Sequence, residues 1–262
     1  MLNKIKNKIR RYQKAKHKRR VNEFTKKYIA DNNLGQLIAL ADELSGSKSP
    51  AVTDYVLLHS LVRSKKPKYM LECGTGKSTW IIADAIRANY LKDGIEGKLI
   101  SMENYKEWHD QAISILPEQL KPFVDIVLSP RATYMHSFIK GTVYEKVPEY
   151  PYEIVFVDGP DYTIRENDKD NIAANMDFIR VLYSSQIPVT AVVDYRLNSV
   201  IAYGILLGKK HVQFIKPWSV GLIENVTKKD LLEEDKHNPS DALERLGLVA
   251  NVQFKEPSWI KL

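Results

Sequence analysis

The sequence of 262 residues contains a single cysteine, Cys73. One cysteine cannot form a disulfide within the chain, so a packed core must hold the fold together, and a reducing compartment is expected. No apolar run reaches the roughly 20 residues that a membrane-spanning helix needs, and no apolar segment typical of a signal peptide follows the basic start. We therefore expect one cytoplasmic α/β domain with appendages.

Acidic residues are almost missing from the first 27 positions, where Glu23 stands beside 12 lysines and arginines. This segment carries a net charge of +11 (12 minus 1), and the remainder carries −4 (27 basic minus 31 acidic residues). Four apolar residues in it follow the 3–4–3 spacing of one helix face: Leu2, Ile5, Ile9 and Tyr12. Residues 1–30 are therefore predicted to form a basic helical arm.

Two kinds of partner suit such an arm, an anionic membrane surface and a nucleic acid. Binding to lipid would place the protein peripherally at a membrane. The alternative is that the apolar stripe packs on the protein's own domain or on a second subunit of a homo-oligomer.

A glycine turn follows the first strand-like run. Residues 69–80 read Tyr-Met-Leu-Glu-Cys-Gly-Thr-Gly-Lys-Ser-Thr-Trp. The apolar run ends at the acidic Glu72, and Gly74 and Gly76 precede Ser78 and a helical pattern. Such a turn brings backbone N–H groups close to a ligand and aims the positive end of a helix at it. The pattern predicts a nucleotide-like cofactor, against the plainer interpretation of a structural strand-to-helix turn.

Three cofactor motifs compete for this turn. A phosphate-binding loop, G-x-x-x-x-G-K-[ST], requires glycine where the chain has Leu71, and a dinucleotide fingerprint, G-x-G-x-x-G, requires glycine where it has Thr79. An acidic strand end followed by G-x-G-x-S-T fits without exception. This third form resembles motif I of the class I S-adenosylmethionine-dependent methyltransferases.

Later apolar runs also end in polar residues. They are Lys98–Glu103, Phe123–Leu128 (followed by Ser129 and Arg131), Tyr152–Asp158 and Val189–Asp194. Their spacing predicts a doubly wound α/β fold with a mostly parallel, seven-stranded Rossmann-like sheet and helices on both faces. Residues 211–215 and 219–224 are expected to form a C-terminal antiparallel hairpin. Ligands bind at the carboxyl edge of such sheets.

The string Leu99-Ile-Ser-Met-Glu103 resembles a strand of the catechol and caffeoyl-CoA type O-methyltransferases, and the order of the motifs extends the resemblance over residues 69–225. It implies that S-adenosylmethionine is the cofactor and that an oxygen of a small molecule or a glycan accepts the methyl group. Glu103 would bind the ribose, Met102 would pack by the adenine, and Ser129 and Arg131 would contact the adenine. The remaining cofactor-binding candidates are Glu72, Gly74, Gly76, Ser78 and Asp158.

Asp158 and Asp194 are the catalytic candidates, because an acceptor hydroxyl needs a base or a metal to remove its proton. In the metal-dependent branch of the resembled family, two such acids hold Mg²⁺ or Mn²⁺ and an asparagine follows the second. This chain has Tyr195 at that position, with Asp161 or Asn198 as compensating ligands. Two alternatives stay open: a small kinase that binds ATP through Lys77 and Ser78, and a non-catalytic binding protein on the same fold.

The expected organisation has four parts. Residues 1–30 form the arm, 31–66 a helical cover, 67–226 the cofactor-binding domain and 227–262 a C-terminal extension with a weak strand at 249–254. Tyr144 and Tyr150, within residues 141–151, are candidates for the wall of the acceptor site.

Overall fold

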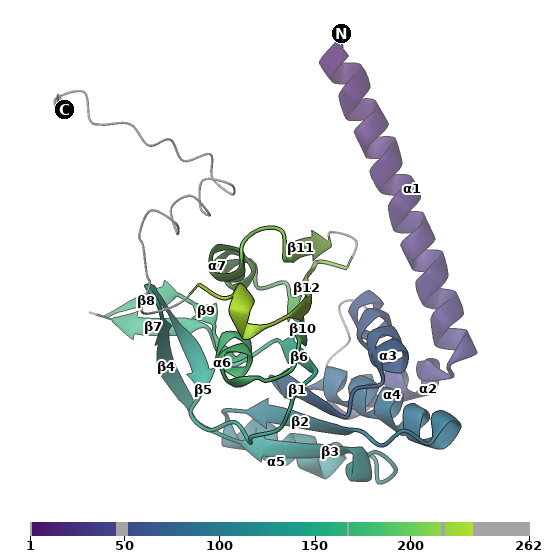
Figure 1. Cartoon of the computed structure of the whole chain (residues 1–262). Helices are drawn as coiled ribbons and strands as arrows, with labels where there is room; N and C mark the ends of the chain where they lie inside the picture. The colour runs from purple at the N-terminus through teal and green to yellow at the C-terminus, as the bar shows by residue number, and fades with distance from the viewer. Residues whose placement is uncertain (1, 46–51, 167, 216–217, 233–262) are drawn as a thin grey trace, which may run out of the picture.

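The computed structural model describes residues 2–45, 52–166, 168–215 and 218–232 (Figure 1). Its centre is a seven-stranded sheet in the order β3-β2-β1-β6-β10-β12-β11. Neighbouring strands from β3 to β10 run parallel, whereas β12 is antiparallel to both β10 and β11. The strands are β1 (Tyr69–Cys73), β2 (Lys98–Glu103), β3 (Val124–Leu128), β6 (Ile154–Val157), β10 (Val189–Asp194), β11 (Val212–Ile215) and β12 (Val220–Val226). The predicted Rossmann-like sheet with its C-terminal hairpin is confirmed.

Helices cover both faces of this sheet (Figure 1). Helices α3 (Thr53–Lys65) and α4 (Lys77–Asp93) pack on one face, and α6 (Asp177–Ser184) and α7 (Leu197–Leu207) pack on the other. Consecutive residues of one strand therefore enter different cores, Met70 beside α3 and α4 and Leu71 beside α6 and α7. Burial of both faces explains why these strands read as continuous apolar runs. Helix α5 (Lys106–Ile115) and the short η1 (Lys121–Phe123) flank the β2–β3 edge.

Two small sheets are formed by residues on either side of β6, in segments where the sequence pattern did not predict strands. A three-stranded sheet contains β4 (Arg131–His136), β5 (Ile139–Tyr144) and β9 (Ala174–Asn175), and a hairpin contains β7 (Thr163–Glu166) and β8 (Lys169–Ile172). Strands β4 and β8 lack the apolar pattern of a core strand. Every residue of β8 is exposed, and only His136 is buried in β4.

The N-terminal helices form a cover against α4. Helix α1 (Leu2–Asp31) is continuous, and α2 (Leu34–Leu44) follows it after a short turn. Val21 and Thr25 of α1 are buried, and the Tyr28 hydroxyl lies 2.9 Å from Nδ1 of the buried His59 on α3. Contact with the body thus begins well before residue 30, the expected end of the arm. Figure 1 shows the N-terminal part of α1 running away from the body.

The chain after β12 closes back on the α6–α7 face. The short η2 (Lys228–Asp230) leads to Leu231 and Leu232, which join the core there, and the Leu232 amide donates to the Leu206 carbonyl at 2.9 Å. The expected strand at 249–254, with the rest of 233–262, lies outside the described residues. None of the described helices combines the length and apolar character that crossing a bilayer requires.

Candidate functional site

The turn after β1 lies where the direction of chain progression reverses. From the central pair β1 and β6, the chain builds β2 and β3 on one side and β10 on the other. Ligands of doubly wound folds bind at such a switch point. Gly74 has φ +103°, and a Cβ atom on it would lie 2.8 Å from the carbonyl oxygen of Asp158. Only glycine fits there. Gly76, in contrast, is extended, and a Cβ atom on it would meet nothing within 4 Å.

Glu72 anchors this turn through buried hydrogen bonds. Its side chain is fully buried, and its carboxylate accepts hydrogen bonds of 2.6 Å from the hydroxyls of Ser78, Thr79 and Ser101. Burial raises the pKa of Glu72 to about 7, against the opposing effect of the three hydroxyl donors. Glu72 and Ser78 therefore lie buried behind the turn, and neither is among the residues that line the pocket described next.

A pocket of about 410 Å³ opens beside the turn, a size within the range of small-molecule sites. It brings together three of the predicted site residues, Gly74, Glu103 and Asp158. An adjoining hollow of about 370 Å³ shares Thr75 and Trp108 with it and includes Gly76. The other residues lining the first pocket are Asn104, Tyr105, Tyr144, Gly159, Pro160, Asp161, Tyr162 and Arg196.

Glu103, the last residue of β2, is held in place by backbone amides. Its Oε1 accepts hydrogen bonds from the N–H groups of Asn104 at 2.7 Å and Tyr105 at 2.9 Å. Burial raises its pKa, and these amide donors oppose the shift. Tyr105 and Trp108 stand beside it with ring centroids 5.1 Å apart, and both side chains remain exposed. A fixed carboxylate next to two aromatic rings suits a ligand that joins a diol to a flat ring.

Three predicted cofactor contacts lie outside the lining of this pocket. Met102 is fully buried, and its carbonyl accepts hydrogen bonds from the Gly74 amide and the Tyr144 hydroxyl, both at 3.1 Å. The buried Ser129 hydroxyl accepts from the Lys146 amide at 2.9 Å. Arg131 donates to the carbonyl of Thr163 at 2.5 Å, at the base of the β7–β8 hairpin. The described contacts of all three stabilise the pocket wall.

Arg196 is the most connected side chain of the site. Its Nη2 and Nε lie 3.1 and 3.3 Å from Oδ1 of Asp158. Its Nη1 lies 3.1 Å from Oδ1 of Asn175 and 3.4 Å from the Pro160 carbonyl, and the guanidinium stands 5.1 Å from the ring centroid of Tyr162. Arg196 therefore clamps the loop after β6 onto the start of α7, two residues beyond Asp194.

The carboxyl groups around Arg196 titrate above their ordinary range. Burial raises the pKa of Asp158 to about 6; Arg196 opposes this shift and Asp194 adds to it. The Asp158 side chain nevertheless keeps 42% of its surface exposed toward the pocket. Burial likewise raises the pKa of Asp194. Such values suit groups that exchange protons near neutral pH.

Asp54, which was not predicted from the sequence, also belongs to this acidic group. It lies in the first turn of α3, in the helical cover. Burial raises its pKa to about 6, with further contributions from the charges of Asp194 and, more weakly, Asp158. No local motif marks Asp54, because its proximity to the sheet edge arises only when the cover helices pack.

The residues at this edge do not suit a divalent cation. The Arg196 guanidinium takes the position beside Asp158 that a cation would need, and Tyr195 is 67% exposed. Both compensating ligands are engaged: Asn198 donates to the Ala173 carbonyl, and Asp161 accepts from the Thr163 amide at 2.9 Å. Within the described residues there is no group of three His, Cys, Asp or Glu side chains placed to hold a metal ion.

The kinase alternative finds no support in this geometry. Only residues 74–76 separate β1 from α4, too few for the loop of a phosphate-binding motif, whose first glycine would fall on Leu71 inside β1. The Lys77 Nζ lies 2.8 Å from Oδ1 of Asp42 on α2. Lys77 therefore joins the cover to α4 in the described contacts.

Of the two tyrosines expected to form an acceptor wall, one lines the pocket. Tyr144 is fully buried and contributes to the pocket through its position against Gly159. Tyr150 stacks on Tyr69 with ring centroids 4.6 Å apart. Because Tyr69 begins β1, Tyr150 lies at the opposite end of the strand from the turn, and its assignment to the acceptor wall is wrong.

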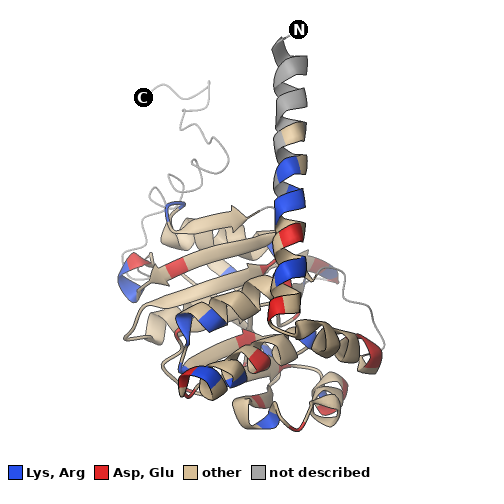
Figure 2. Ribbon diagram, turned by 90° about the vertical axis from the view of Figure 1, so that its right-hand side faces the viewer, with Lys and Arg blue, Asp and Glu red and all other residues tan. Residues whose placement is uncertain are grey.

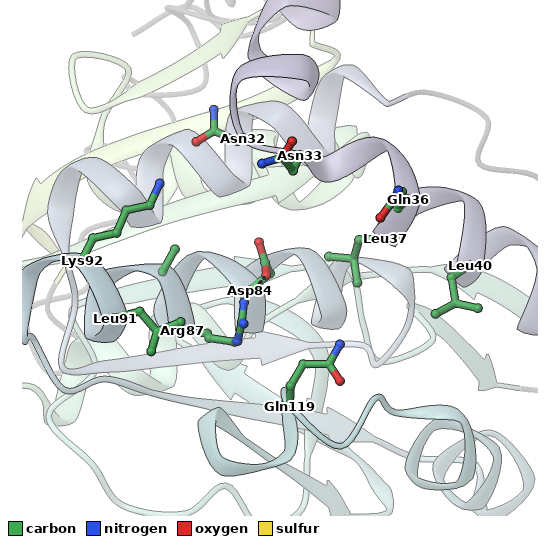
Figure 3. A pocket seen from close by; sticks show the side chains of 11 residues that line it. Asn32, Asn33, Gln36, Leu37, Leu40, Asp84, Arg87, Leu91, Lys92 and Gln119 are labelled. Atoms are coloured by element: carbon green, nitrogen blue, oxygen red, sulfur yellow. Dashed lines mark hydrogen bonds and ion pairs between the residues drawn. The ribbon is translucent and has the colours of Figure 1, made fainter.

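A further hollow of about 450 Å³ lies between the α1–α2 turn and α4 (Figure 3). Its lining is rich in amide side chains, among them Asn32, Gln36 and Gln119, together with Asp84 and Arg87 of α4. It contains none of the residues at the carboxyl ends of the strands. The candidate site is therefore the pocket beside the glycine turn.

The solved structures to which this chain is similar include three methyltransferases. One from Podospora anserina, crystallised with SAH, has 15% identity and a TM-score of 0.38, over 65% of this chain and 64% of that one. One from Geobacter sulfurreducens has 15% identity and a TM-score of 0.43, over 79% and 88%. A candidate caffeoyl-CoA O-methyltransferase from Staphylococcus aureus has 18% identity and a TM-score of 0.42, over 70% and 76%.

These likenesses say nothing of what this chain binds or catalyses, because the identities and TM-scores are low. No protein-family model and no curated protein sequence matches the chain.

Proposed function

We propose that this protein is a class I S-adenosylmethionine-dependent methyltransferase that methylates an oxygen of a small molecule or a glycan. The observation that carries the proposal is the meeting of Gly74, Glu103 and Asp158 in one pocket at the switch point of the sheet. They come from three different strand ends in the order that the resemblance predicts. A structural glycine turn alone would not require an amide-held carboxylate on the next strand.

The fit to the cofactor can be followed group by group. Backbone N–H groups at the start of α4 would receive a carboxylate of the ligand. Glu103 would accept hydrogen bonds from the ribose hydroxyls, and Tyr105 and Trp108 would flank the adenine ring. S-Adenosylmethionine, when bound, supplies a methyl group activated on a sulfonium sulfur.

The chain's own residues then need to orient the acceptor and receive its proton. Asp158 faces the pocket with a pKa of about 6, so it is ionised at neutral pH and still basic enough to take a proton. When the acceptor hydroxyl is methylated, this carboxylate would receive the hydroxyl proton. Arg196 holds Asp158 in place, the charge of Asp194 raises the pKa of Asp158, and no metal is required for this step.

The rim of the pocket supports a ring-shaped acceptor. Tyr162, which lines the pocket, exposes 37% of its surface, and Tyr195 and Leu197, the neighbours of the lining residue Arg196 in the sequence, expose 67% and 46%. The Ala173 amide donates to the Tyr162 carbonyl, and Asn198 donates to the Ala173 carbonyl. These hydrogen bonds join the segment after β8 to Tyr162 and to the start of α7. Aromatic faces beside carboxylates suit the apolar face and hydroxyl groups of a sugar or a phenol.

The direct test is calorimetric titration of the full chain with S-adenosylmethionine, S-adenosylhomocysteine and ATP, with and without Mg²⁺. The proposal expects both S-adenosyl ligands to bind and ATP to bind more weakly or not at all. Preference for ATP with Mg²⁺ would revive the kinase alternative. Cofactor binding with no methyl transfer to any sugar or phenol acceptor would favour a non-catalytic binding protein.

A further inference from the structure

Helix α1 is packed on the body only near its C-terminal end, among its described side chains. Among the described side chains of α1, those buried against the body lie near its end: Val21 is 5% and Thr25 3% exposed, whereas Tyr12 is 68% exposed. Nine residues separate Tyr12 from Val21, about two and a half turns at 3.6 residues per turn. Tyr12 therefore lies on the opposite side of α1 from the packed face.

The sequence places an apolar stripe on that outward side. Leu2, Ile5 and Ile9 share the helix face of Tyr12 by their spacing. The first 27 residues carry +11, and the rest of the chain carries −4. In Figure 2, the coloured part of α1 that extends from the body carries mainly blue turns, whereas the body mixes both signs. The helix thus combines an apolar stripe in the sequence, whose described member Tyr12 is exposed, with a positive charge that the body lacks.

We propose that residues 2–20 of α1 bind the surface of an anionic lipid bilayer. The helix would lie along the surface, with the Tyr12 stripe toward the acyl chains and the lysines and arginines among the headgroups. The net negative body would be repelled from the same surface, so the arm alone would set the orientation. This proposal is independent of the methyltransferase assignment.

Two other partners fit these observations less well. A nucleic acid attracts the charge through its phosphates but offers no apolar phase to a stripe of aliphatic side chains. A second copy of the arm would cover the stripe but would bring two segments of +11 together. A bilayer of anionic lipid satisfies both the stripe and the charge.

Co-sedimentation with vesicles tests the charge requirement. The full chain is expected to bind phosphatidylserine–phosphatidylcholine vesicles and not pure phosphatidylcholine vesicles, and binding should weaken as salt increases. Replacing the exposed Lys16, Lys18, Arg19 and Arg20 by Gln should weaken binding by at least about tenfold. The matched control replaces four exposed lysines of the body by Gln, namely Lys65, Lys92, Lys209 and Lys210, and should retain most of the binding.

A fluorophore on the stripe tests the apolar requirement. Cys73 is fully buried, so a Tyr12→Cys variant offers one accessible thiol for an environment-sensitive dye. Vesicles should shift the emission of this dye to the blue. A dye on a Lys18→Cys variant, roughly 120° around the helix, should shift much less.

Three results would overturn the proposal. One is the absence of binding to anionic vesicles in about 0.1 M salt. Another is an equal loss of vesicle binding in the arm variant and in the body variant. The third is tight RNA binding that depends on the four arm charges, with no dye response to vesicles, which would assign the arm to nucleic acid.

Discussion

The guanidinium of Arg196 lies against the carboxylate of Asp158, with Nη2 3.1 Å and Nε 3.3 Å from Oδ1. The same guanidinium reaches Asn175 and the Pro160 carbonyl, so it fixes both the charge and the position of the loop after β6. Arg196 therefore supplies a permanent positive charge at this edge of the sheet.

The pH dependence of turnover should therefore respond to Arg196. If Asp158 is the base, kcat/KM rises as pH increases through about 6, where this carboxyl ionises. Arg196 lowers the pKa of Asp158, so Arg196→Gln should move the acid limb of the profile to higher pH. Arg196→Lys keeps the charge and should move it less. The measurement is kcat/KM from pH 5 to 9, with thermal unfolding as a check on folding.

Arg165→Gln provides the control, since Arg165 is 70% exposed on the β7–β8 hairpin. Its profile should match that of the parent protein. An unchanged acid limb in Arg196→Gln would show that Asp158 is not the titrating base. Activity that disappears with a chelator and returns with Mg²⁺ would show that the residues at this edge do bind a metal.

Substitutions of the two glycines of the turn should have different effects, one on the stability of the fold and the other on cofactor binding. Gly74→Ala places a Cβ 2.8 Å from the Asp158 carbonyl at φ +103°, so it should destabilise the fold by roughly 1–3 kcal/mol or more. Gly76→Ala meets no atom within 4 Å and should fold normally. Because Gly76 borders the space predicted for the cofactor, its methyl group should weaken S-adenosylhomocysteine binding. Denaturant unfolding and calorimetry on both variants measure the two effects, and a destabilised Gly76→Ala protein would contradict this division.

Glu103 should contribute directly to cofactor affinity. Glu103→Ala removes the acceptor proposed for the ribose hydroxyls and should weaken S-adenosylhomocysteine binding by about 1.5–3 kcal/mol, the scale of hydrogen bonds to a charged group. Glu107→Ala, at an exposed position of α5, changes the net charge equally and should leave the affinity unchanged. Equal affinities of the two variants, measured by calorimetry, would remove Glu103 from the binding site.

The central sheet was predictable from the sequence because its strands are apolar on both faces. The predicted bounds of β2 and β10 agree with the structure, and those of β3, β11 and β12 differ by one or two residues at one or both ends. The inserted strands were not predictable in the same way. Strand β8 is wholly exposed, and β4 has one buried residue, so neither shows the apolar pattern that burial creates.

The candidate site was predictable where function follows a strand end. Gly74, Glu103 and Asp158 each terminate or follow a strand, and the carboxyl ends of parallel strands meet at one edge. Glu72 shows the limit of this reasoning, because the sequence marks its position but not whether its side chain points into the pocket or the core. The involvement of Asp54 depends on how the cover helices pack, which no local pattern encodes.

Turnover should depend on both acids at the sheet edge. Asp158→Asn should lower kcat by about 10²-fold or more, the usual scale for the loss of a general base, while S-adenosylhomocysteine affinity changes little. Asp194→Asn should reduce turnover less, since Asp194 acts on Asp158 through its charge in the proposed mechanism. Asp125→Asn, on an exposed part of β3, is the control for charge. Full activity in both Asp158→Asn and Asp194→Asn would show that these two acids have only a structural role.

Glu72 should make the unfolding free energy depend on pH. Burial raises its pKa from 4.5 to about 7 in the folded chain. Between these values the native state binds more protons than the unfolded state, so stability falls as pH rises, by up to about 1.4 kcal/mol per pH unit for one group. Glu72→Gln removes this contribution. Its stability should therefore decline less than that of the parent between pH 4.5 and 7, apart from a constant offset from altered hydrogen bonds.

Urea unfolding at several pH values measures this difference. Asp177 is also buried and its pKa is raised to about 7, chiefly by burial, so part of the decline should persist in the variant. Glu118→Gln, at a side chain that is 85% exposed, controls for the change in net charge. Parallel curves for the parent and Glu72→Gln would mean that the three hydroxyl donors hold Glu72 ionised across the range. In that case the hydroxyls of Ser78, Thr79 and Ser101 would outweigh the cost of burial, and Glu72 would anchor the turn as a charged group.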